Sequence, residues 1–393
     1  MKFNTRLVSF DPCPDDPFRP VATPIYQTAT FEQECADSFG PYDYSRSGNP
    51  TRTVLEQQLA RLENGTRAFC FASGMAAITS VARLLSPGDE ILAADDLYGG
   101  AYRLFSKILR HTGITVRYVN ASNLDAVREA IQPRTRLIYI ETPTNPLLQI
   151  IDIAGIAELA KKHDILFCVD NSVMSPYLQL PLDLGADIVL HSATKFLCGH
   201  GDVTGGVVVV KDPQLVQDIY LIQNGEGAAL GPFDCFLLLR GLKTMSLRMD
   251  AQQARAQKLT AFLSEHPLVK KVYFPGLPNH PGHHLHASQA RGFGSVISFE
   301  TGSFELSRKV AEATQLFAIT VSFGSLNSTI SLPGSMSHAS VPPELRATRY
   351  LPADLVRISV GIEDPDDLID DLGKAFQGSA VNSDQTHSVA KVR

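Results

Sequence analysis

Short apolar segments alternate with helix-length segments along the chain as far as Gly241. Each apolar segment is a nearly continuous hydrophobic run, which is typical of a strand buried on both faces of a parallel sheet. The pattern predicts an α/β fold with a mainly parallel sheet of about seven strands joined by crossover helices. The predicted strands cover residues 68–71, 90–93, 115–119, 136–140, 165–169, 187–190 and 206–210.

A helical pattern begins at Thr51, where apolar residues recur at positions 54, 55, 59 and 62. The same spacing predicts that Glu56 and Glu63 face outward and that the helix ends at residues 64–65, an Asn-Gly C-cap. Residues 1–45 carry prolines at positions 12, 14, 17, 20, 24 and 41 and show no useful helical period. We therefore expect an extended N-terminal arm that lies on another subunit or on its own chain.

The pattern changes after Gly241. Residues 242–263 are expected to form one long helix, followed by short strands near 269–274 and 295–300, two helical stretches and a strand within 355–361. This predicts a smaller C-terminal α+β domain, residues 242–393, beside a large domain of residues 46–241. The tail from Gly378 is rich in Ser, Asn, Asp and Thr and is expected to fray.

Length and charge narrow the class of ligand. The chain has 393 residues, 44% of them hydrophobic, which is enough for two or three domains. Its 35 Lys and Arg against 41 Asp and Glu give a net charge of −6, and no acidic or basic run is present in the sequence. Nucleic acid and a membrane surface are therefore disfavoured as partners, and a small molecule fits better.

The cysteines and the N-terminal sequence bear on the compartment. The 6 cysteines, at positions 13, 35, 70, 168, 198 and 235, show no Cys-x-x-Cys spacing, and several lie inside apolar runs as buried thiols do. The start of the sequence lacks an apolar signal core, and no uninterrupted apolar stretch approaches the roughly 18 residues of a spanning helix. We expect a cytoplasmic protein; a plastid location would require a transit peptide.

One lysine stands at the end of a predicted strand. The segment 187–201 opens with an apolar run, continues through Ser192 and Thr194, presents Lys195 and closes on glycines. Taken alone, a loop lysine is usually a solvated surface residue. The strand 165–169 ends at Asp170, which by itself would fit a helix N-cap. Because the carboxyl ends of parallel strands share one edge of a sheet, Asp170 and Lys195 can face one pocket.

This pair fits a site for pyridoxal 5′-phosphate (PLP). A lysine amine can form a Schiff base with the cofactor's aldehyde, and a carboxylate can keep the pyridine nitrogen protonated so that the ring withdraws electrons. Downstream of another strand, Ser73, Gly74 and Met75 open a helix whose first N–H groups can receive a phosphate. A plain strand-to-helix turn would explain those three residues equally well.

Several motifs in order resemble the PLP-dependent enzymes of Cys and Met metabolism, the family of cystathionine β-lyase, cystathionine γ-lyase, cystathionine γ-synthase and methionine γ-lyase. The segment 192–200, Ser-Ala-Thr-Lys-Phe-Leu-Cys-Gly-His, is similar to the family's cofactor-attachment signature. Segments 40–52, 69–75 and 336–340 most resemble plant-type cystathionine β-lyases, and the likeness extends from Thr23 to Phe376. It implies the aspartate-aminotransferase-like fold (fold type I), PLP as cofactor, and homodimers with shared active sites that assemble into a homotetramer.

The resemblance also implies roles for individual residues. Lys195 is expected to carry PLP and move protons, and Asp170 to contact the ring nitrogen. The cofactor phosphate is expected beside Ser73, at the amides of Gly74 and Met75 and the hydroxyls of Ser192 and Thr194. Tyr98 is expected to stack on the ring and act as a second catalytic residue, although such tyrosines are usually core or interface residues. Asn145 is expected near the ring hydroxyl and the substrate.

Four further residues complete the expected site. Tyr44 and Arg46 belong to the N-terminal arm, and the resemblance places them on the phosphate in the neighbouring subunit's site, with Tyr44 also near the substrate. Without the motif, Arg46 would be an ordinary surface arginine. Arg357 lies in an apolar run, where its charge needs a partner. The resemblance implies that this partner is the substrate's α-carboxylate, with Ser322 also at the substrate.

The implied reaction is β-elimination from L-cystathionine to homocysteine, pyruvate and ammonia, as in methionine biosynthesis by transsulfuration. The γ-acting members commonly carry an acidic residue at the place of Asn327, where it can engage the distal amino group of cystathionine, so its loss favours β-cleavage. Three γ-acting alternatives stay open: cystathionine γ-lyase, cystathionine γ-synthase and methionine γ-lyase. A catalytically idle, PLP-loaded regulatory protein is the alternative from another class.

Four histidines, His280, His283, His284 and His286, could suggest a metal site. No cysteine or carboxylate co-ligands are arranged around them in the sequence, and prolines and glycines mark the segment as a loop. We therefore expect no metal.

Overall fold

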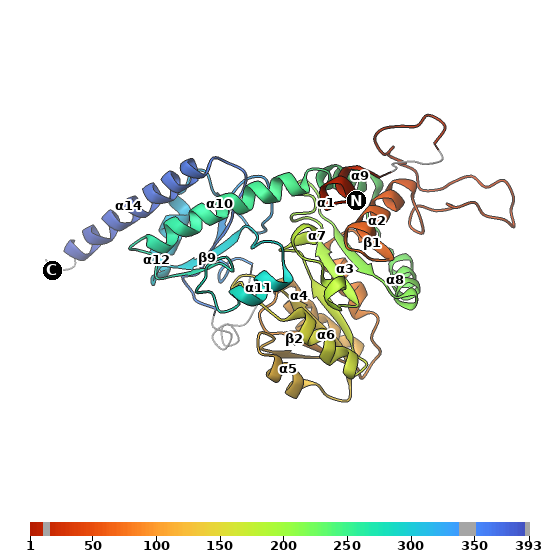
Figure 1. The fold of residues 1–393 in the computed structure, drawn as a ribbon, viewed down its shortest axis with the longest axis horizontal. Helices are drawn as coiled ribbons and strands as arrows, with labels where there is room; N and C mark the ends of the chain where they lie inside the picture. Colours follow the sequence, from red (N-terminus) through yellow and green to blue (C-terminus); the bar gives the residue numbers. More distant parts are fainter. Residues whose placement is uncertain (11–15, 338–350, 390–393) are drawn as a thin grey trace.

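The computed structural model describes residues 1–10, 16–337 and 351–389, with side chains described through residue 379. Cys13 and residues 338–340 of the last motif lie outside the described residues. The chain forms two sheets, each covered by helices, and the long helix α10 (Met245–Glu265) runs between the two parts (Figure 1).

The larger sheet has seven strands in the order β1-β7-β6-β5-β4-β2-β3. The neighbours from β6 to β3 are parallel, whereas β7 is antiparallel to both β6 and β1. The prediction of an α/β fold with a mainly parallel seven-stranded sheet is therefore confirmed. The strands are β1 (Arg67–Phe71), β2 (Glu90–Ala94), β3 (Thr115–Val119), β4 (Thr135–Glu141), β5 (Leu166–Asp170), β6 (Ile188–Ser192) and β7 (Gly206–Val210).

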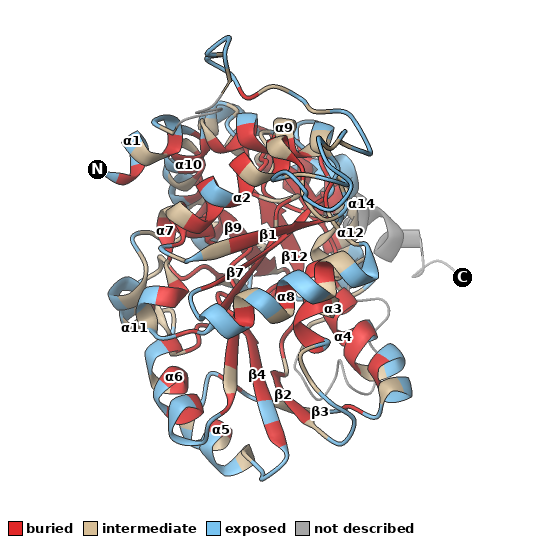
Figure 2. Cartoon of the chain, turned by 90° about the vertical axis from the view of Figure 1, so that its right-hand side faces the viewer, coloured by how far each residue is buried: buried red, intermediate tan, exposed pale blue. Residues whose placement is uncertain are grey.

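The sheet is buried on both faces, which explains why its strands are continuous apolar runs. On β7, Val208 and Val210 pack with helices α3 and α8 on one face, whereas Val207 and Val209 pack with α2 and α9 on the other. Figure 2 shows buried residues running through the sheet and exposed residues on the outer sides of the surrounding helices. The helical segments here are α2 (Pro50–Leu62), α3 (Gly74–Ala82), α4 (Gly99–Arg103), the π-helix η1 (Leu104–Ile108), η2 (Leu109–Thr112), α5 (Leu124–Ala130), α6 (Ile153–Lys162), α7 (Ser175–Leu178), η3 (Pro181–Leu184), α8 (Pro213–Glu226) and α9 (Pro232–Leu242).

The smaller sheet has five strands in the order β10-β11-β12-β9-β8 and its own apolar core. Helix α14 continues past Gly378, where the tail was expected to fray, and ends at Val389. The strands are β8 (Lys271–Tyr273), β9 (Val296–Glu300), β10 (Ala318–Ile319), β11 (Thr329–Ser331) and β12 (Val356–Ser359). The helices are α10, α11 (His283–Gln289), α12 (Phe304–Ala313) and α14 (Pro365–Val389).

The N-terminal segment differs in part from the expected extended arm. Residues 3–8 form helix α1 (Phe3–Val8), because Phe3 and Leu7 lie one helical turn apart and are buried against the chain's own body. Residues 16–49 contain no helix or strand and form an arm that projects from the body (Figure 1). Phe18 and Val21 on this arm are 90% and 95% exposed, so the arm leaves large apolar side chains uncovered.

Helix α2 contradicts one prediction. Glu56 and Glu63 were expected to face outward, but they are 3% and 0% exposed. The helix packs against both β1 and α9, so more than one of its faces is buried and the apolar spacing does not mark a single inner face. Both carboxylates have polar partners in the interior: Glu56 accepts the Cys70 N–H at 2.9 Å, and Glu63 lies 2.5 Å from His191.

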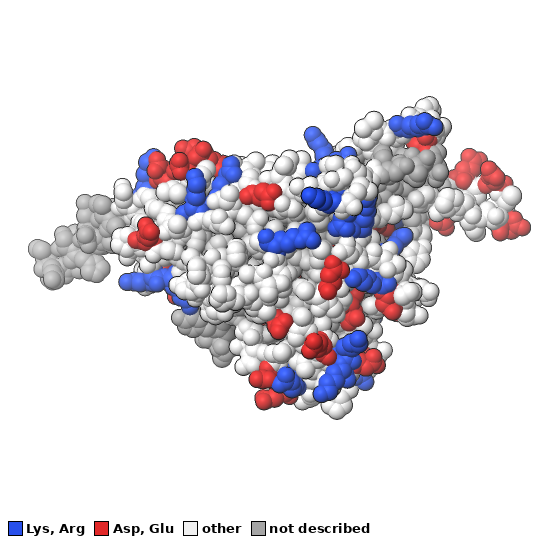
Figure 3. All heavy atoms as spheres, viewed as in Figure 1, with Lys and Arg blue, Asp and Glu red and all other residues white. Residues whose placement is uncertain are grey.

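Two observations bear on the surface of the described part of the chain. None of its helices is both long and apolar enough to cross a membrane. On the face shown in Figure 3, basic and acidic side chains are interspersed over the body of the molecule.

Candidate functional site

A cavity of about 410 Å³ lies where the ends of β5 and β6 meet β12 and the loop between β10 and β11. This volume suits a small ligand. Its lining brings together almost every expected site residue, drawn from distant parts of the sequence: Ser73, Gly74, Met75, Tyr98, Asn145, Asp170, Ser192, Thr194, Lys195, Ser322 and Arg357. Of the expected residues, Tyr44 and Arg46 are not part of this lining.

The amine of the half-buried Lys195 lies in this cavity. Its Nζ donates to the Oγ of Ser322 and lies 4.9 Å from the centre of the Phe323 ring. Burial, and then the charge of Arg357, lower the pKa of Lys195 to about 8, against the opposing effect of Asp170 and Glu141. A lysine with such a pKa is partly neutral near physiological pH and can act as a nucleophile or a base.

The turn that carries Lys195 is held by a buried arginine. Arg248 donates through Nη1 to the carbonyl of Phe196 at 3.0 Å and through Nη2 to that of Gly241 at 2.9 Å. Gly199 has a φ of 73°, and a Cβ built on it would lie 1.8 Å from Nη1 of Arg248. Glycine is therefore required at this position, both for its conformation and for the arginine's approach.

Asp170 lies at the end of β5 with its carboxylate well supported. It accepts the Ser172 N–H at 3.0 Å and the Tyr139 hydroxyl at 3.2 Å. Burial raises the pKa of Asp170, while the bonds from Ser172 and the charge of His191 oppose that rise. His191 is in turn bonded to Glu63 at 2.5 Å, which fixes the orientation of its ring.

A second carboxyl group, Glu141, lines the cavity and was not expected from the sequence. It pairs with Asp170 in the register of β4 and β5, and it accepts the Tyr98 N–H at 3.1 Å. Burial and then the charge of Asp170 raise its pKa well above the ordinary value. The signal was present in the sequence, since the apolar run of β4 ends in an acidic residue just as that of β5 does.

Helix α3 directs its N-terminus at the cavity. The Oγ of Ser73 caps the helix by accepting the Ala76 N–H at 3.1 Å. As first-turn residues, Gly74 and Met75 have N–H groups without acceptors inside the helix. A Cβ on Gly74 would lie 3.1 Å from the Cβ of Ser192, so the helix end and the Ser192 side chain are close neighbours. Such a helix end favours an anion.

Tyr98 precedes helix α4 and presents its ring to the cavity. Its backbone is fixed by the bond to Glu141, while the side chain remains 39% exposed. A Cβ on Gly100 would lie 2.3 Å from Cε1 of Tyr98, so the ring rests where a larger residue would displace it. An aromatic ring held in this way can stack on a planar ligand.

Arg357 is 2% exposed and also lines the cavity. Its Nη1 donates to Oδ1 of Asn145 at 2.8 Å, and its Nη2 donates to the carbonyl of Ser322 at 2.7 Å. Its buried Nε has no hydrogen-bond partner in the described part of the protein. Ser322, with a φ of 88°, thus bridges Arg357 and Lys195 through an uncommon backbone conformation.

Tyr44 and Arg46 lie on the arm. The Arg46 guanidinium stacks on the Tyr44 ring at 5.2 Å, and its Nε donates to Asn224 at 3.2 Å. Neither side chain reaches the cavity of its own chain.

Two other features do not add to this site. A larger hollow of about 760 Å³ includes Lys270, Lys271 and His280, but no acidic residue faces these groups in the described lining.

In the histidine cluster, His283 and His286 bond to backbone carbonyls at 2.8 and 2.9 Å, and the described residues contain no group of His, Cys, Asp and Glu suited to a metal.

Residues 4–377 match the family described as Cys/Met metabolism PLP-dependent enzyme. The chain belongs to this family. A relative named "Cystathionine beta-lyase, chloroplastic" from Arabidopsis thaliana is 57% identical over 362 residues, 92% of this chain and 78% of that protein. A "Cystathionine gamma-lyase" from Bacillus subtilis is 47% identical over 96% of this chain and 100% of that protein. The crystal structure of cystathionine gamma-lyase from Lactobacillus plantarum complexed with L-serine superposes with a TM-score of 0.94 at 45% identity, covering 96% of this chain and 99% of that one.

The cavity fits the cofactor of this PLP-dependent family. It combines a lysine amine of lowered pKa, a carboxylate that accepts two hydrogen bonds and a helix N-terminus at which an anion is favoured. The orphaned Nε of Arg357 further indicates that the cavity is built to receive an additional acceptor.

Proposed function

We propose that this protein is a PLP-dependent carbon–sulfur lyase that cleaves L-cystathionine by β-elimination to homocysteine, pyruvate and ammonia. The observation that carries the proposal is that Lys195, Asp170 and Arg357 line one cavity in a chain of this family. These are the groups needed for covalent attachment, for charge at a pyridine nitrogen and for a carboxylate.

Each of these residues has a distinct proposed role. Asp170 would keep the proton on the pyridine nitrogen, the N-terminus of α3 with Ser192 and Thr194 would hold the phosphate, and Tyr98 would pack against the ring. When bound, PLP supplies an electron sink for the pair left on the substrate's Cα. Lys195 carries the cofactor between turnovers, and its freed Nζ removes the Cα proton. Arg357 holds the substrate's α-carboxylate, and Asn145 orients the arginine through the contact that it already makes.

The pH dependence of cofactor uptake tests the role of Lys195. Apoprotein is expected to take up PLP faster as the pH rises, with a midpoint near the Lys195 pKa of about 8. The reason is that only the neutral amine attacks an aldehyde, and a lowered pKa makes the amine neutral at lower pH. Stopped-flow absorbance measures the rate, with free Nα-acetyl-lysine, which keeps its ε-amine, as the control. A protein midpoint near about 10.4, the ordinary lysine value, would contradict the proposal.

The preference for β-cleavage rests mainly on similarity, because Asn327 is exposed and does not line the cavity. Two relatives named "Cystathionine beta-lyase, chloroplastic", from Arabidopsis thaliana and Mimosa pudica, are each 57% identical to this chain, against 47% for the Bacillus subtilis protein named for γ-cleavage.

Product analysis tests the reaction type. The PLP-loaded enzyme, incubated with L-cystathionine, is expected to release mainly pyruvate and homocysteine, and a Lys195→Ala control neither. Mainly 2-oxobutyrate and cysteine would show γ-cleavage instead. Absence of both oxoacids would overturn cleavage of cystathionine and leave cystathionine γ-synthase, methionine γ-lyase or the idle regulatory protein.

We also propose that the chain works as a homodimer with shared active sites, assembled into a homotetramer. The support is that Tyr44 and Arg46 lie on a projecting arm with exposed apolar side chains, such as Phe18 and Val21, that its own chain leaves uncovered. Arg46 presents a guanidinium suited to a phosphate. A second copy of the chain is the partner whose cavity would accept it.

For location, we propose the cytoplasm, with a plastid as the alternative. The support is that the described cysteines, Cys35, Cys70, Cys168, Cys198 and Cys235, are all free thiols. Fluorescence microscopy of a tagged full-length protein would separate the two locations.

A further inference from the structure

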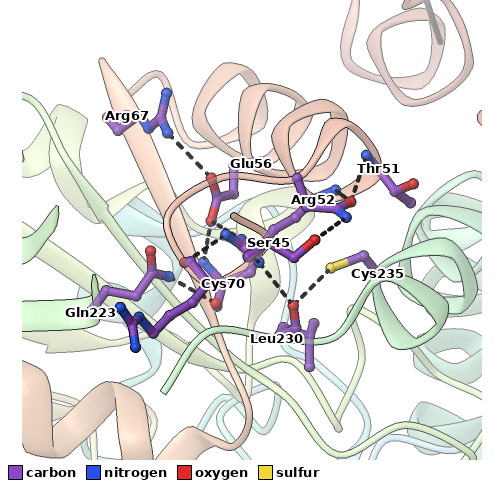
Figure 4. Close-up of polar contacts among 11 residues, drawn as sticks. Ser45, Thr51, Arg52, Glu56, Arg67, Cys70, Gln223, Leu230 and Cys235 are labelled. Atoms are coloured by element: carbon purple, nitrogen blue, oxygen red, sulfur yellow. Dashed lines mark hydrogen bonds and ion pairs between the residues drawn. The ribbon is translucent and has the colours of Figure 1, made fainter. Parts of the chain in front are cut away.

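Helix α2 carries a buried ion pair that has no role in the chemistry described above. Arg52 and Glu56 are each 3% exposed, and the arginine Nε lies 3.7 Å from Oε1 of the glutamate. Figure 4 shows the two side chains directed into one polar cluster with Ser45, Cys70 and Leu230. Burying two charges is costly unless each is bonded further, so their other contacts indicate what the pair is for.

Arg52 holds the base of the arm. Its Nη1 donates to the carbonyl of Ser45 at 2.8 Å, and its Nη2 donates to the carbonyl of Arg46 at 3.0 Å. A longer contact of 3.4 Å joins Nη1 to the carbonyl of Leu230. The planar guanidinium therefore fixes two consecutive carbonyls at the point where the arm leaves the body, next to the side chains of Tyr44 and Arg46.

Glu56 fixes the other side of the cluster to the large sheet. Its Oε1 accepts the N–H of Cys70 on β1 at 2.9 Å, and its Oε2 lies 3.4 Å from Nη2 of Arg67. The Cys70 carbonyl is held in turn by the Leu230 N–H at 3.0 Å and by Gln223 at 2.9 Å. Through Glu56, Arg52 is thus anchored to strand β1, so the position of the arm's base is set by the sheet.

We propose that Arg52 and Glu56 are positioning residues that fix the direction of the arm and so place Arg46 in the active site of the neighbouring subunit. The inference rests on the proposed sharing of sites between subunits. Its physical basis is that a rigid, buried fork holds the backbone of Arg46 itself, whereas the Arg46 side chain stays on the surface and free to engage a second copy after releasing Asn224. A lysine at position 52 would keep the charge but cannot hold two carbonyls in a fixed geometry.

Hybrid dimers provide the test. A reference mixture combines Arg46→Ala subunits, which keep Lys195, with Lys195→Ala subunits, which keep an intact arm. After subunit exchange, each hybrid has one complete site, made of the lysine from the first subunit and the arm from the second, so activity is expected to return. No recovery after demonstrated exchange would overturn the sharing of sites, and this inference with it.

The Arg52→Lys change is then added to one subunit type at a time. In the Lys195→Ala subunit, which donates the arm, it is expected to lower hybrid activity at least about tenfold, since a misplacement of about 1 Å can cost roughly a hundredfold. In the Arg46→Ala subunit, which donates the lysine, it is expected to have little effect, because the arm of that subunit serves the inactive site. Equal losses in both arrangements, a loss confined to the lysine donor, or no loss in the arm donor would overturn the positioning role while leaving site sharing intact.

A second variant separates a positioning effect from misfolding caused by an unpaired buried charge. The double change Arg52→Gln with Glu56→Gln leaves no unpaired buried charge and is expected to give the same dependence on the subunit that carries it. Arg61→Lys is the matched control, because Arg61 lies on the same helix and donates to the Ser9 carbonyl at 2.8 Å, away from the arm. It is expected to be neutral in either subunit.

Hydrogen exchange gives a readout independent of catalysis. The N–H groups of Ser47 and Gly48 donate to the Tyr44 carbonyl at 2.9 and 3.0 Å. In the Arg52→Lys protein, with or without PLP, these amides are expected to exchange faster, whereas those of β9 stay unchanged. Unchanged exchange at Ser47 and Gly48 would show that Arg52 does not hold the arm.

Discussion

Lys195→Ala protein is expected to lose turnover of L-cystathionine by roughly a thousandfold or more. Its amine is the group that carries the cofactor and removes the Cα proton in the proposed reaction, and a positioned base alone contributes about 10²–10⁴-fold. The variant is expected to fold, because the lysine's main polar contact, with the Ser322 Oγ, lies inside the cavity rather than in the apolar core. Steady-state kinetics with an oxoacid assay measures the loss.

Lys211→Ala is the matched control, since Lys211 contacts Asp183 at the surface and is far from the proposed chemistry. It should keep full activity. Borohydride reduction of the unaltered enzyme is expected to fix the cofactor on Lys195, detected by peptide mass spectrometry. Wild-type activity in Lys195→Ala, or fixation on another residue, would show the assignment to be wrong.

Arg357→Lys is expected to lower kcat/KM roughly 10- to 150-fold, mostly through a higher KM. The change keeps a buried positive charge but removes the fork that can bind both oxygens of a carboxylate. A charge-assisted hydrogen bond is worth about 1.5–3 kcal/mol, which corresponds to that range. Cofactor binding should be retained, because Arg357 is bonded to Asn145 and Ser322 and is not part of the α3 end.

Arg308→Lys serves as the control for this change, as Arg308 pairs with Glu305 and Glu312 on an exposed helix. Kinetics with L-cystathionine and absorbance of bound PLP should be measured on both variants. An unchanged KM in Arg357→Lys would show that the arginine does not bind the substrate's carboxylate.

The local sequence was sufficient to predict the strands that are buried on both faces. Strand β7 carries valines on both of its faces because helices cover both sides of the sheet. A continuous apolar run therefore identifies this strand without any knowledge of its neighbours. The same reasoning placed Asp170 and Lys195 at one edge of the sheet, since strand direction in a parallel sheet fixes where each strand ends. The cavity contains both residues.

The sequence pattern failed where one element has several neighbours. The spacing in α2 predicted Glu56 and Glu63 to face solvent, yet both are buried, because α9 and β1 cover different sides of the helix. Their polar partners lie outside the helix: His191 for Glu63, and Arg67 with the Cys70 N–H for Glu56. A helical period cannot reveal such partners.

By itself, then, the sequence determined the order of the strands along the chain, the edge of the sheet that bears the chemistry and the identity of the groups with the right functional atoms. Only the tertiary structure decided that Ser322 bridges Lys195 and Arg357, that Glu141 lies beside Asp170, and that Arg52 holds the arm. The physical reason is that strand and helix periods follow from each segment's own burial, whereas the lowered pKa of Lys195 and the pairing of buried charges depend on atoms that only folding brings within a few ångströms.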